Sequence, residues 1–197
     1  MAEIQTRTYT IRYARQSDVP VILQLIQELA EYEKSLHEVG ATEESLRATL
    51  SFPEPSRPSG FTEGFAKTLL ISPRSSASAG GSDGDSAEQQ PEVAGMALFF
   101  HNYSTWTAAP GIYLEDLFVR PQYRGTGFGT ALIQALAREC LRLGCKRLDW
   151  SVLKWNTPSI EFYTGESIGA TRMEEWVGMR VDTENLPRLA AKGERAK

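Results

Sequence analysis

A glycine-rich turn between an apolar run and an amphipathic segment constrains this chain most. The turn covers residues 123–130 (YRGTGFGT) and follows an apolar run, 113–119, that we expect to form a strand ending before Pro121. Glycines let the backbone approach a phosphate because no side chain holds it off. The unpaired N–H groups and the dipole of a following helix also attract an anion. The sequence therefore predicts a site for a phosphorylated ligand here.

The glycine spacing argues against two common nucleotide motifs. Gly125, Gly127 and Gly129 alternate with other residues, whereas a dinucleotide site has the pattern G-x-G-x-x-G, with an acidic residue about 20 positions later. A P-loop has a lysine before Ser or Thr, and Thr130 follows the last glycine without one. The remaining alternatives are another phosphate-binding motif and an ordinary glycine-rich connection.

Composition indicates one soluble domain over residues 1–197. The chain is 41% apolar and 23% charged, with a net charge of −4, which disfavours nucleic-acid binding. The sequence shows no transmembrane segment and no apolar signal core, so we expect no membrane association and a cytoplasmic location. Cys140, Cys145, His37 and His101 form no metal-ligand pattern. We therefore expect no metal site and two buried, unreactive cysteines.

Hydrophobic patterns predict an α/β fold with a mixed, twisted sheet of about six or seven strands and about four helices. We expect strands at 7–14, 65–72, 93–100, 113–119, 147–153 and 176–181. Helices are expected to begin within residues 17–20, at Thr42, after the glycine turn, and at Asn156 or Thr157, the third ending near Gly144. The core stripe of that third helix is assigned to Leu132, Ile133, Leu136, Ala137, Cys140 and Leu141.

Residues 73–91 contain no large apolar side chain. Such a Ser/Gly-rich segment cannot repay the entropy cost of ordering. We interpret it as a flexible insertion between two strands that pair with each other.

Four segments resemble a known family. Arg124, Gly127 and Gly129 match the Arg-x-x-Gly-x-Gly pyrophosphate signature of the GNAT acetyltransferases. Residues 30–33 (AEYE), 113–116 (YLED) and 155–159 (WNTPS) resemble the diamine (spermidine/spermine) acetyltransferases and their thialysine-acetylating relatives. The resemblance spans about residues 11–180. It implies the GNAT fold, acetyl transfer from acetyl-CoA to a primary amine by direct attack, and a homodimer.

The resemblance also implies which residues bind acetyl-CoA. The backbone of the glycine turn would hold the pyrophosphate, and the strand edge at 117–119 would pair with the pantetheine arm. The implied contacts are Leu117, Phe118, Val119, Arg124, Gly125, Thr126, Gly127, Phe128, Gly129, Thr130, Asn156 and Ser159.

Two catalytic roles follow from the same resemblance. Tyr163 would protonate the leaving thiolate, and Glu115 would accept the proton of the amine. An amine with a pKa of about 10.4 is neutral only about one part in a thousand near pH 7.4, a handicap of about 4 kcal/mol. Asp116 should point to the other face of its strand unless a bulge intervenes. The implied acceptor contacts are Tyr32, Glu33, Glu115, Asp149, Trp150, Ser151, Glu174 and Glu175.

The match departs from the family after Tyr163. Residues 164–170 are two longer than is usual and carry no basic side chain. The stretch 151–156 is closer to the thialysine enzymes than to the polyamine ones, so a diamine, a polyamine and a lysine analogue all remain possible acceptors. A peptide N-acetyltransferase and an idle acyl-CoA-binding regulator are the alternatives, although an idle regulator needs neither Glu115 nor Tyr163. A nucleotide-dependent oxidoreductase is disfavoured by the glycine spacing.

Overall fold

The computed structural model describes residues 3–74 and 92–191, which belong to two compact units, Met1–Ser159 and Ile160–Lys197. The first unit holds the whole sheet and the glycine turn. Most of the predicted insertion at 73–91 lies outside the described residues. Within the described residues, no helix combines the length and the apolar composition needed to cross a bilayer.

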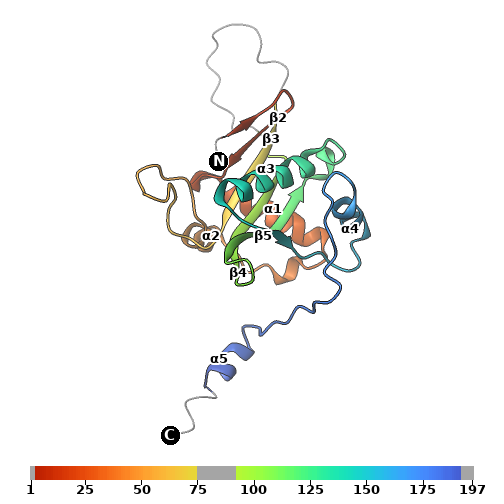
Figure 1. Cartoon of the computed structure of the whole chain (residues 1–197). Coiled ribbons are helices and arrows are strands. Elements are labelled where there is room, and N and C mark those ends of the chain that lie inside the picture. Colours follow the sequence, from red (N-terminus) through yellow and green to blue (C-terminus); the bar gives the residue numbers. More distant parts are fainter. Residues whose placement is uncertain (1–2, 75–91, 192–197) are drawn as a thin grey trace. The chain divides into compact units, whose positions relative to one another are not determined.

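The sheet of the N-terminal unit has six strands in chain order (Figure 1). All neighbours are antiparallel except β5 and β6, which are parallel. β3 and β4, on either side of the insertion, pair with each other as predicted. The strands are β1 (Ile4–Gln5), β2 (Tyr9–Tyr13), β3 (Lys67–Pro73), β4 (Gly95–Ser104), β5 (Ala109–Val119) and β6 (Leu148–Trp150).

Helices α1 and α2 form one apolar cluster with the sheet, and α3 crosses the sheet (Figure 1). Leu70, Met96, Leu98 and Phe118 belong to the α1 side, and their strand neighbours face α3. This order of strands and helices confirms the predicted mixed α/β class. The helices are α1 (Val19–Tyr32), α2 (Glu43–Thr49), α3 (Phe128–Leu143), α4 (Thr157–Thr164) and α5 (Asn185–Ala190).

Local capping signals place most of the helix ends. Thr42 accepts a hydrogen bond from the backbone N–H of Ser45 (3.1 Å) and begins α2 as predicted. Gly144 ends α3 with a φ of 72°, the left-handed conformation that glycine adopts easily. Asp18 precedes α1, but its carboxylate accepts from Arg12 and from the Arg15 backbone instead of capping the helix.

Two expectations about packing are wrong. Residues 176–181 form no strand, because no described strand pairs with them and an extended segment becomes a strand only through such pairing. Leu141 is 80% exposed and Ala137 is exposed, so neither belongs to the core stripe of α3. Leu141 directly follows the buried Cys140 and is turned about 100° away from it around the helix. Both cysteines are buried, as expected.

Candidate active site

The turn before α3 exposes its backbone. Gly125 and Gly127 have φ values of 75° and 84°, a conformation that other residues adopt only with strain. Gly127 is the N-cap of α3, and Thr126 Oγ1 stabilises the turn by donating a hydrogen bond to the Tyr123 carbonyl (2.6 Å). The first turn of α3, which includes Gly129 and Thr130, carries no acidic side chain. The free N–H groups of this helix end therefore suit an anion such as the pyrophosphate of CoA.

Arg124, the signature arginine, is held by neighbouring groups. Its Nε donates to the Val119 carbonyl (2.9 Å), and its guanidinium lies 4.9 Å from the ring centre of Tyr32 and 5.7 Å from that of Phe118. Contacts of a cation with aromatic rings at this range are attractive. Arg124 thus connects the turn between β5 and α3 to the end of β5 and to two aromatic rings.

One edge of β5 is open beside this turn. β6 pairs only with Ile112–Leu114, whereas β5 continues to Val119. On that side, residues 115–119 have no strand partner among the described residues. Such an edge can pair with the amide groups of a pantetheine arm as with an added strand. The backbone of Leu117 and Phe118 therefore fits the contact implied by the resemblance, while the Val119 carbonyl already accepts from Arg124.

A β-bulge lies at the centre of this segment. Asp116 is opposite Leu98 on β4, and Leu114 is opposite the next residue, Phe99. Glu115 is therefore an extra residue without an opposite partner, and a bulge re-aims the side chains around it. Glu115 is exposed, and Asp116 is half-buried on the α1 side of the sheet. The bulge thus brings both carboxylates into the candidate site.

Among the carboxyl groups of the candidate site, Asp116 has the most strongly shifted pKa. Burial raises its pKa to about 6, and the negative charges of Glu115 and Glu33 contribute to the rise. Glu33 follows the last residue of α1, and burial raises its pKa too. Asp116 is therefore within electrostatic reach of both Glu115 and Glu33. Such an arrangement of carboxylates suits a cation and a proton-accepting group. The sequence did not assign Asp116 to the site, because its orientation depends on the bulge.

The start of α4 is tied to the end of α1. Asn156 is only 5% exposed, and its Oδ1 accepts from the Ser159 backbone (3.3 Å) and from the Tyr32 hydroxyl (3.2 Å). Asn156, one of the two helix starts that the sequence predicts, therefore caps α4, and Pro158 occupies the first turn. The ring of Tyr32 lies 6.1 Å from that of Trp155. The resemblance implies that Tyr32 contacts the acceptor. In the structure, Tyr32 contacts both Arg124 of the glycine turn and Asn156, the cap of α4.

The predicted acceptor contacts Asp149 and Trp150 of β6 and Ser151, which follows this strand, do not share one face. Asp149 is opposite Tyr113, and the Ser151 hydroxyl lies 2.7 Å from the Tyr113 hydroxyl. Trp150 is opposite Leu114, so strand alternation turns it to the other face of the sheet. Asp149 and Ser151 are therefore together on the side of Tyr113, without Trp150.

The remaining predicted residues belong to the C-terminal unit. The Tyr163 carbonyl accepts from the Ala170 backbone (2.9 Å), so the lengthened segment 164–170 folds back onto its own helix. Glu174 pairs with Arg172 at 3.1 Å, and its neighbour Glu175 is exposed. The catalytic role of Tyr163 and the acceptor roles of Glu174 and Glu175 stay predictions.

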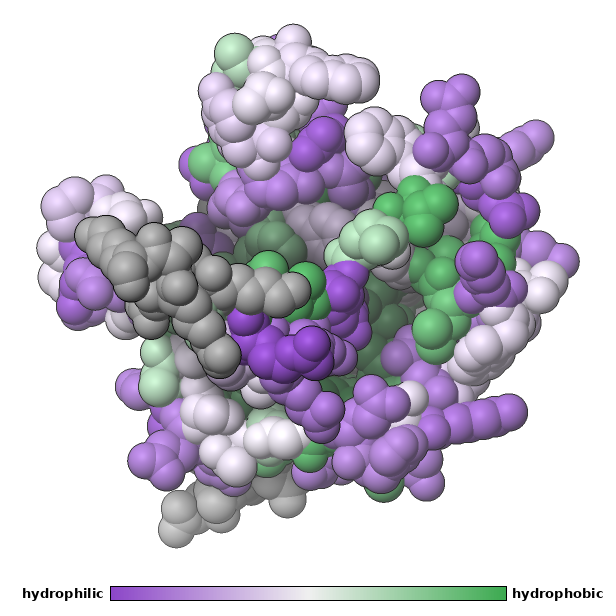
Figure 2. Space-filling view, turned by 90° about the horizontal axis from the view of Figure 1, so that it is seen from below, coloured by the Kyte–Doolittle hydropathy of each residue, from purple (hydrophilic) through white to green (hydrophobic). Residues whose placement is uncertain are grey.

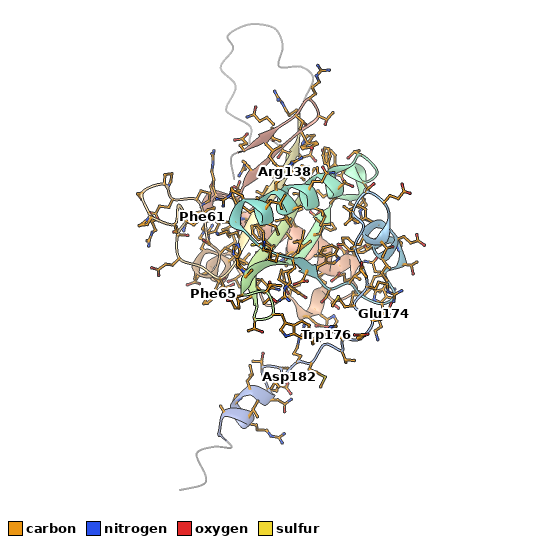
Figure 3. All side chains as sticks on the ribbon, viewed as in Figure 1. Phe61, Phe65, Arg138, Glu174, Trp176 and Asp182 are labelled. Carbon is orange, nitrogen blue, oxygen red and sulfur yellow. The ribbon has the colours of Figure 1, made fainter. Side chains whose placement is uncertain are left out.

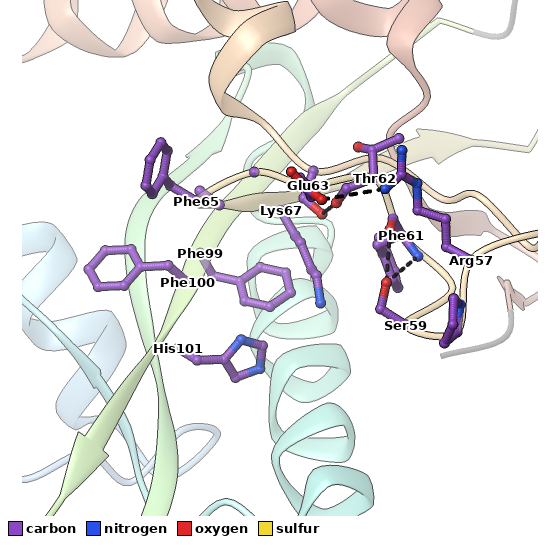
Figure 4. A pocket seen from close by; sticks show the side chains of 14 residues that line it. Arg57, Ser59, Phe61, Thr62, Glu63, Phe65, Lys67, Phe99, Phe100 and His101 are labelled. Carbon is purple, nitrogen blue, oxygen red and sulfur yellow. Dashed lines mark hydrogen bonds and ion pairs between the residues drawn. The ribbon is translucent and has the colours of Figure 1, made fainter.

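A pocket of about 570 Å³ lies between β4 and the loop before β3 (Figure 4). Lys67 points into it, with its Nζ 4.1 Å from the ring centre of Phe61, and burial lowers the pKa of Lys67. None of the predicted site residues lines this pocket. Phe100 does line it and stacks on Tyr113, with ring centres 5.1 Å apart. The pocket therefore borders the predicted site through Phe100 without being that site.

Large apolar side chains also reach the surface. Phe65 is 85% exposed and Trp106 is 88% exposed. Figure 2 shows apolar patches in green among hydrophilic side chains in purple, and Figure 3 labels Phe61 and Phe65 on the loop before β3.

Comparison with known proteins decides the family. Residues 43–169 match the model of the acetyltransferase (GNAT) family. This chain belongs to the GNAT acetyltransferases. It is 37% identical over 185 residues to the thialysine N-epsilon-acetyltransferase of Mus musculus, covering 92% of this chain and 97% of that protein. The L-ornithine N5-acetyltransferase NATA1 of Arabidopsis thaliana is 35% identical over 189 residues, covering 84% of this chain and 81% of that protein.

Solved structures show the same fold. An integron cassette protein from the mobile metagenome of V. cholerae superimposes with a TM-score of 0.66 at 22% identity, covering 94% of this chain and 99% of that one. The expected GNAT fold, the family and the acetyltransferase class are therefore confirmed.

Proposed function

We propose that this protein transfers the acetyl group of acetyl-CoA to a primary amine of a small cationic acceptor. The observation that carries the proposal is the carboxylate cluster at the β5 bulge, where the half-buried Asp116 lies within electrostatic reach of Glu115 and Glu33. Similar proteins bear the names of acetyltransferases for thialysine and ornithine, both small amines. A cluster of carboxylates at the sheet centre suits such a cation better than a neutral or anionic acceptor.

The reaction removes two protons from the acceptor nitrogen and supplies one to the leaving thiolate. The amine arrives as an ammonium ion attracted by the carboxylates and gives its first proton to the Glu115–Asp116 pair. The neutral nitrogen attacks the thioester carbonyl carbon, the C–N bond forms, and the C–S bond breaks. Tyr163, the predicted acid, gives its proton to the departing thiolate and is restored by the second proton that the nitrogen loses. The products are the N-acetylated amine and CoA.

The raised pKa of Asp116 makes this proton transfer easier. Transfer from an amine of pKa about 10.4 to an ordinary aspartate of pKa about 3.9 is uphill by more than six units. An acceptor whose pKa is about 6 reduces that gap by about two units, or on the order of 3 kcal/mol.

Acetyl-CoA is proposed to lie along the open edge of β5, with its pyrophosphate at the glycine turn. The left-handed Gly125 and Gly127, the N-terminal end of α3 and the unpaired edge at 115–119 support this placement. Asn156 and Ser159 would join the contact from the start of α4. The homodimer and the cytoplasmic location expected from the resemblance stay part of the proposal.

The proposal is tested by measuring CoA release from acetyl-CoA against putrescine, spermidine, lysine, thialysine, ornithine and a short peptide with a free N-terminus. We expect turnover with at least one small amine and none with the peptide. Turnover with the peptide alone would favour a protein N-acetyltransferase. Binding of acetyl-CoA without turnover on any acceptor would favour an acyl-CoA-binding regulator.

A further inference from the structure

An ion pair at the start of β6 lies on the same face of the sheet as Asp116. Leu98, opposite Asp116, and Asn102 are four residues apart on β4 and therefore share a face. The amide of Asn102 donates to Asp149 Oδ2 (2.9 Å), and Arg147 Nε lies 2.8 Å from the same oxygen. The pair Arg147–Asp149 is therefore on the acceptor side of the sheet.

The strand register gives the separation between this pair and Asp116. Asp149 is opposite Tyr113, whose β4 partner Phe100 is two residues from Leu98. Two residues advance about 7 Å along a strand, and adjacent strands are about 5 Å apart, so the separation is about 8 Å. Five bonds join the ε-nitrogen of a lysine analogue to its α-carbon and span about 6 Å, and the α-substituents reach one bond further. An amino acid acetylated beside Asp116 can therefore place its α-substituents at Arg147 and Asp149.

Arg147 and Asp149 both have hydrogen-bonding atoms that remain available to a ligand. The two contacts of Asp149 use Oδ2, and its Oδ1 accepts from no described residue. Arg147 Nη2 makes one long hydrogen bond to the Tyr103 carbonyl (3.4 Å), and its Nη1 donates to no described residue. The side chains of Arg147 and Asp149 are 42% and 38% exposed. A carboxylate can reach the guanidinium while an ammonium reaches Asp149 Oδ1.

Gly111 makes room for this arrangement. A Cβ at position 111 would collide with Asn102 Oδ1 and come within 2.8 Å of Arg147 Cγ. The Asn102 Oδ1 atom is buried and accepts no hydrogen bond from any described residue. The Asn102 amide is thus oriented with its NH₂ group toward Asp149.

We propose that Arg147 and Asp149 bind the α-carboxylate and the α-ammonium of an amino-acid acceptor whose side-chain amine is acetylated beside Asp116. This inference rests on the proposed function and adds the residues that select the acceptor. A zwitterion matches two opposite charges held 2.8 Å apart. A diamine would bring its distal ammonium against the positive charge of Arg147, so the same pair disfavours diamines.

The test compares each amino acid with the diamine that lacks only its carboxylate: ornithine with putrescine, and lysine with cadaverine. In the wild type we expect a higher kcat/KM for the amino acid of each pair. Arg147→Met should lower kcat/KM for the amino acid at least tenfold and raise it for the diamine, because Asp149 then faces the distal ammonium alone. General damage to the fold would lower both values together.

Arg47→Met is the matched control, because Arg47 is also 42% exposed and pairs with an acid, Glu43, at 2.7 Å. It should leave the ratio of the two kcat/KM values unchanged. Equal changes for amino acid and diamine in Arg147→Met, or no change in either, would overturn the proposed acceptor contact. Absence of turnover on every amine in the wild type would instead contradict the proposed function.

Discussion

The turn before α3 and the bulge in β5 lie about ten residues apart in the sequence and present opposite kinds of groups. The turn offers backbone N–H groups at a helix end, arranged by Gly125 and Gly127. The bulge offers the side-chain carboxylates of Glu115 and Asp116. One region therefore attracts anions through the main chain, and the other attracts cations through side chains.

This difference predicts different tolerance to substitution. A side chain in the turn can change without loss of the N–H donors, provided that the backbone conformation is kept. A carboxylate at the bulge cannot be replaced without losing its charge and its proton-accepting oxygen. The acetyl-CoA half of the site should therefore depend on backbone conformation, and the acceptor half on two acidic residues.

Asp116→Asn should have the largest effect on activity. The amide cannot accept the proton of the amine, so we expect kcat/KM to fall at least about 100-fold. The pKa of Asp116 is about 6 in the folded protein and about 3.9 in an unfolded chain, so its ionisation destabilises the fold as pH rises from about 4 to 6. The variant should therefore gain stability at pH 7.5, on the order of 1–3 kcal/mol by chemical denaturation. A variant that is both less active and less stable would show that Asp116 is a structural residue.

Glu115→Gln should lower kcat/KM about tenfold near neutral pH and also shift the pH profile. The charge of Glu115 helps to raise the pKa of Asp116. Its removal should move the acidic limb of kcat/KM toward lower pH. Glu43→Gln, on the exposed surface of α2, is the control and should leave the limb in place. If the acidic limb of kcat/KM does not shift in Glu115→Gln, the charge of Glu115 does not influence the proton acceptor.

Gly127→Ala should mainly weaken the binding of acetyl-CoA. The added methyl group has free space, but a φ of 84° is unfavourable for alanine, so we expect a stability loss of about 1 kcal/mol. Any shift of the turn would misplace its N–H groups and raise the KM for acetyl-CoA several-fold. Gly40→Ala, with free space and no positive φ, is the matched control. Unchanged KM and stability in Gly127→Ala would contradict the role of the turn conformation.

Arg124→Gln should have the smallest effect. Its side chain contacts the Val119 carbonyl and two aromatic rings, so the substitution should loosen the turn while keeping every backbone donor. We expect the KM for acetyl-CoA to rise about threefold, with kcat nearly unchanged, as measured by steady-state kinetics. A 100-fold rise in KM would show that the guanidinium itself binds the phosphates.

The sequence predicts the local features of this fold well because each depends on a few adjacent residues. The helix cap at Thr42, the helix end at Gly144 and the cap at Asn156 are all of this kind. The glycine turn is predictable for the same reason, since only glycine adopts its φ values easily.

Features that depend on distant segments could not be predicted. The bulge exists only in the register of β5 against β4, so the sequence could not tell whether Asp116 joins Glu115. The Arg147–Asp149 pair likewise depends on Asn102, a residue of another strand. Residues 176–181 have the pattern of a strand, but pairing defines a strand and no described strand supplies it.

The measurement that tests the account most directly is the pH dependence of kcat/KM for the best small-amine acceptor, from pH 4.5 to 8.5, with acetyl-CoA binding followed over the same range. A proton-accepting carboxylate pair that includes Asp116 predicts a plateau above about pH 6 and a fall of about tenfold per pH unit below it, with acetyl-CoA binding unchanged. A profile without a limb between pH 5 and 7 would contradict the role of the bulge carboxylates as the proton acceptor.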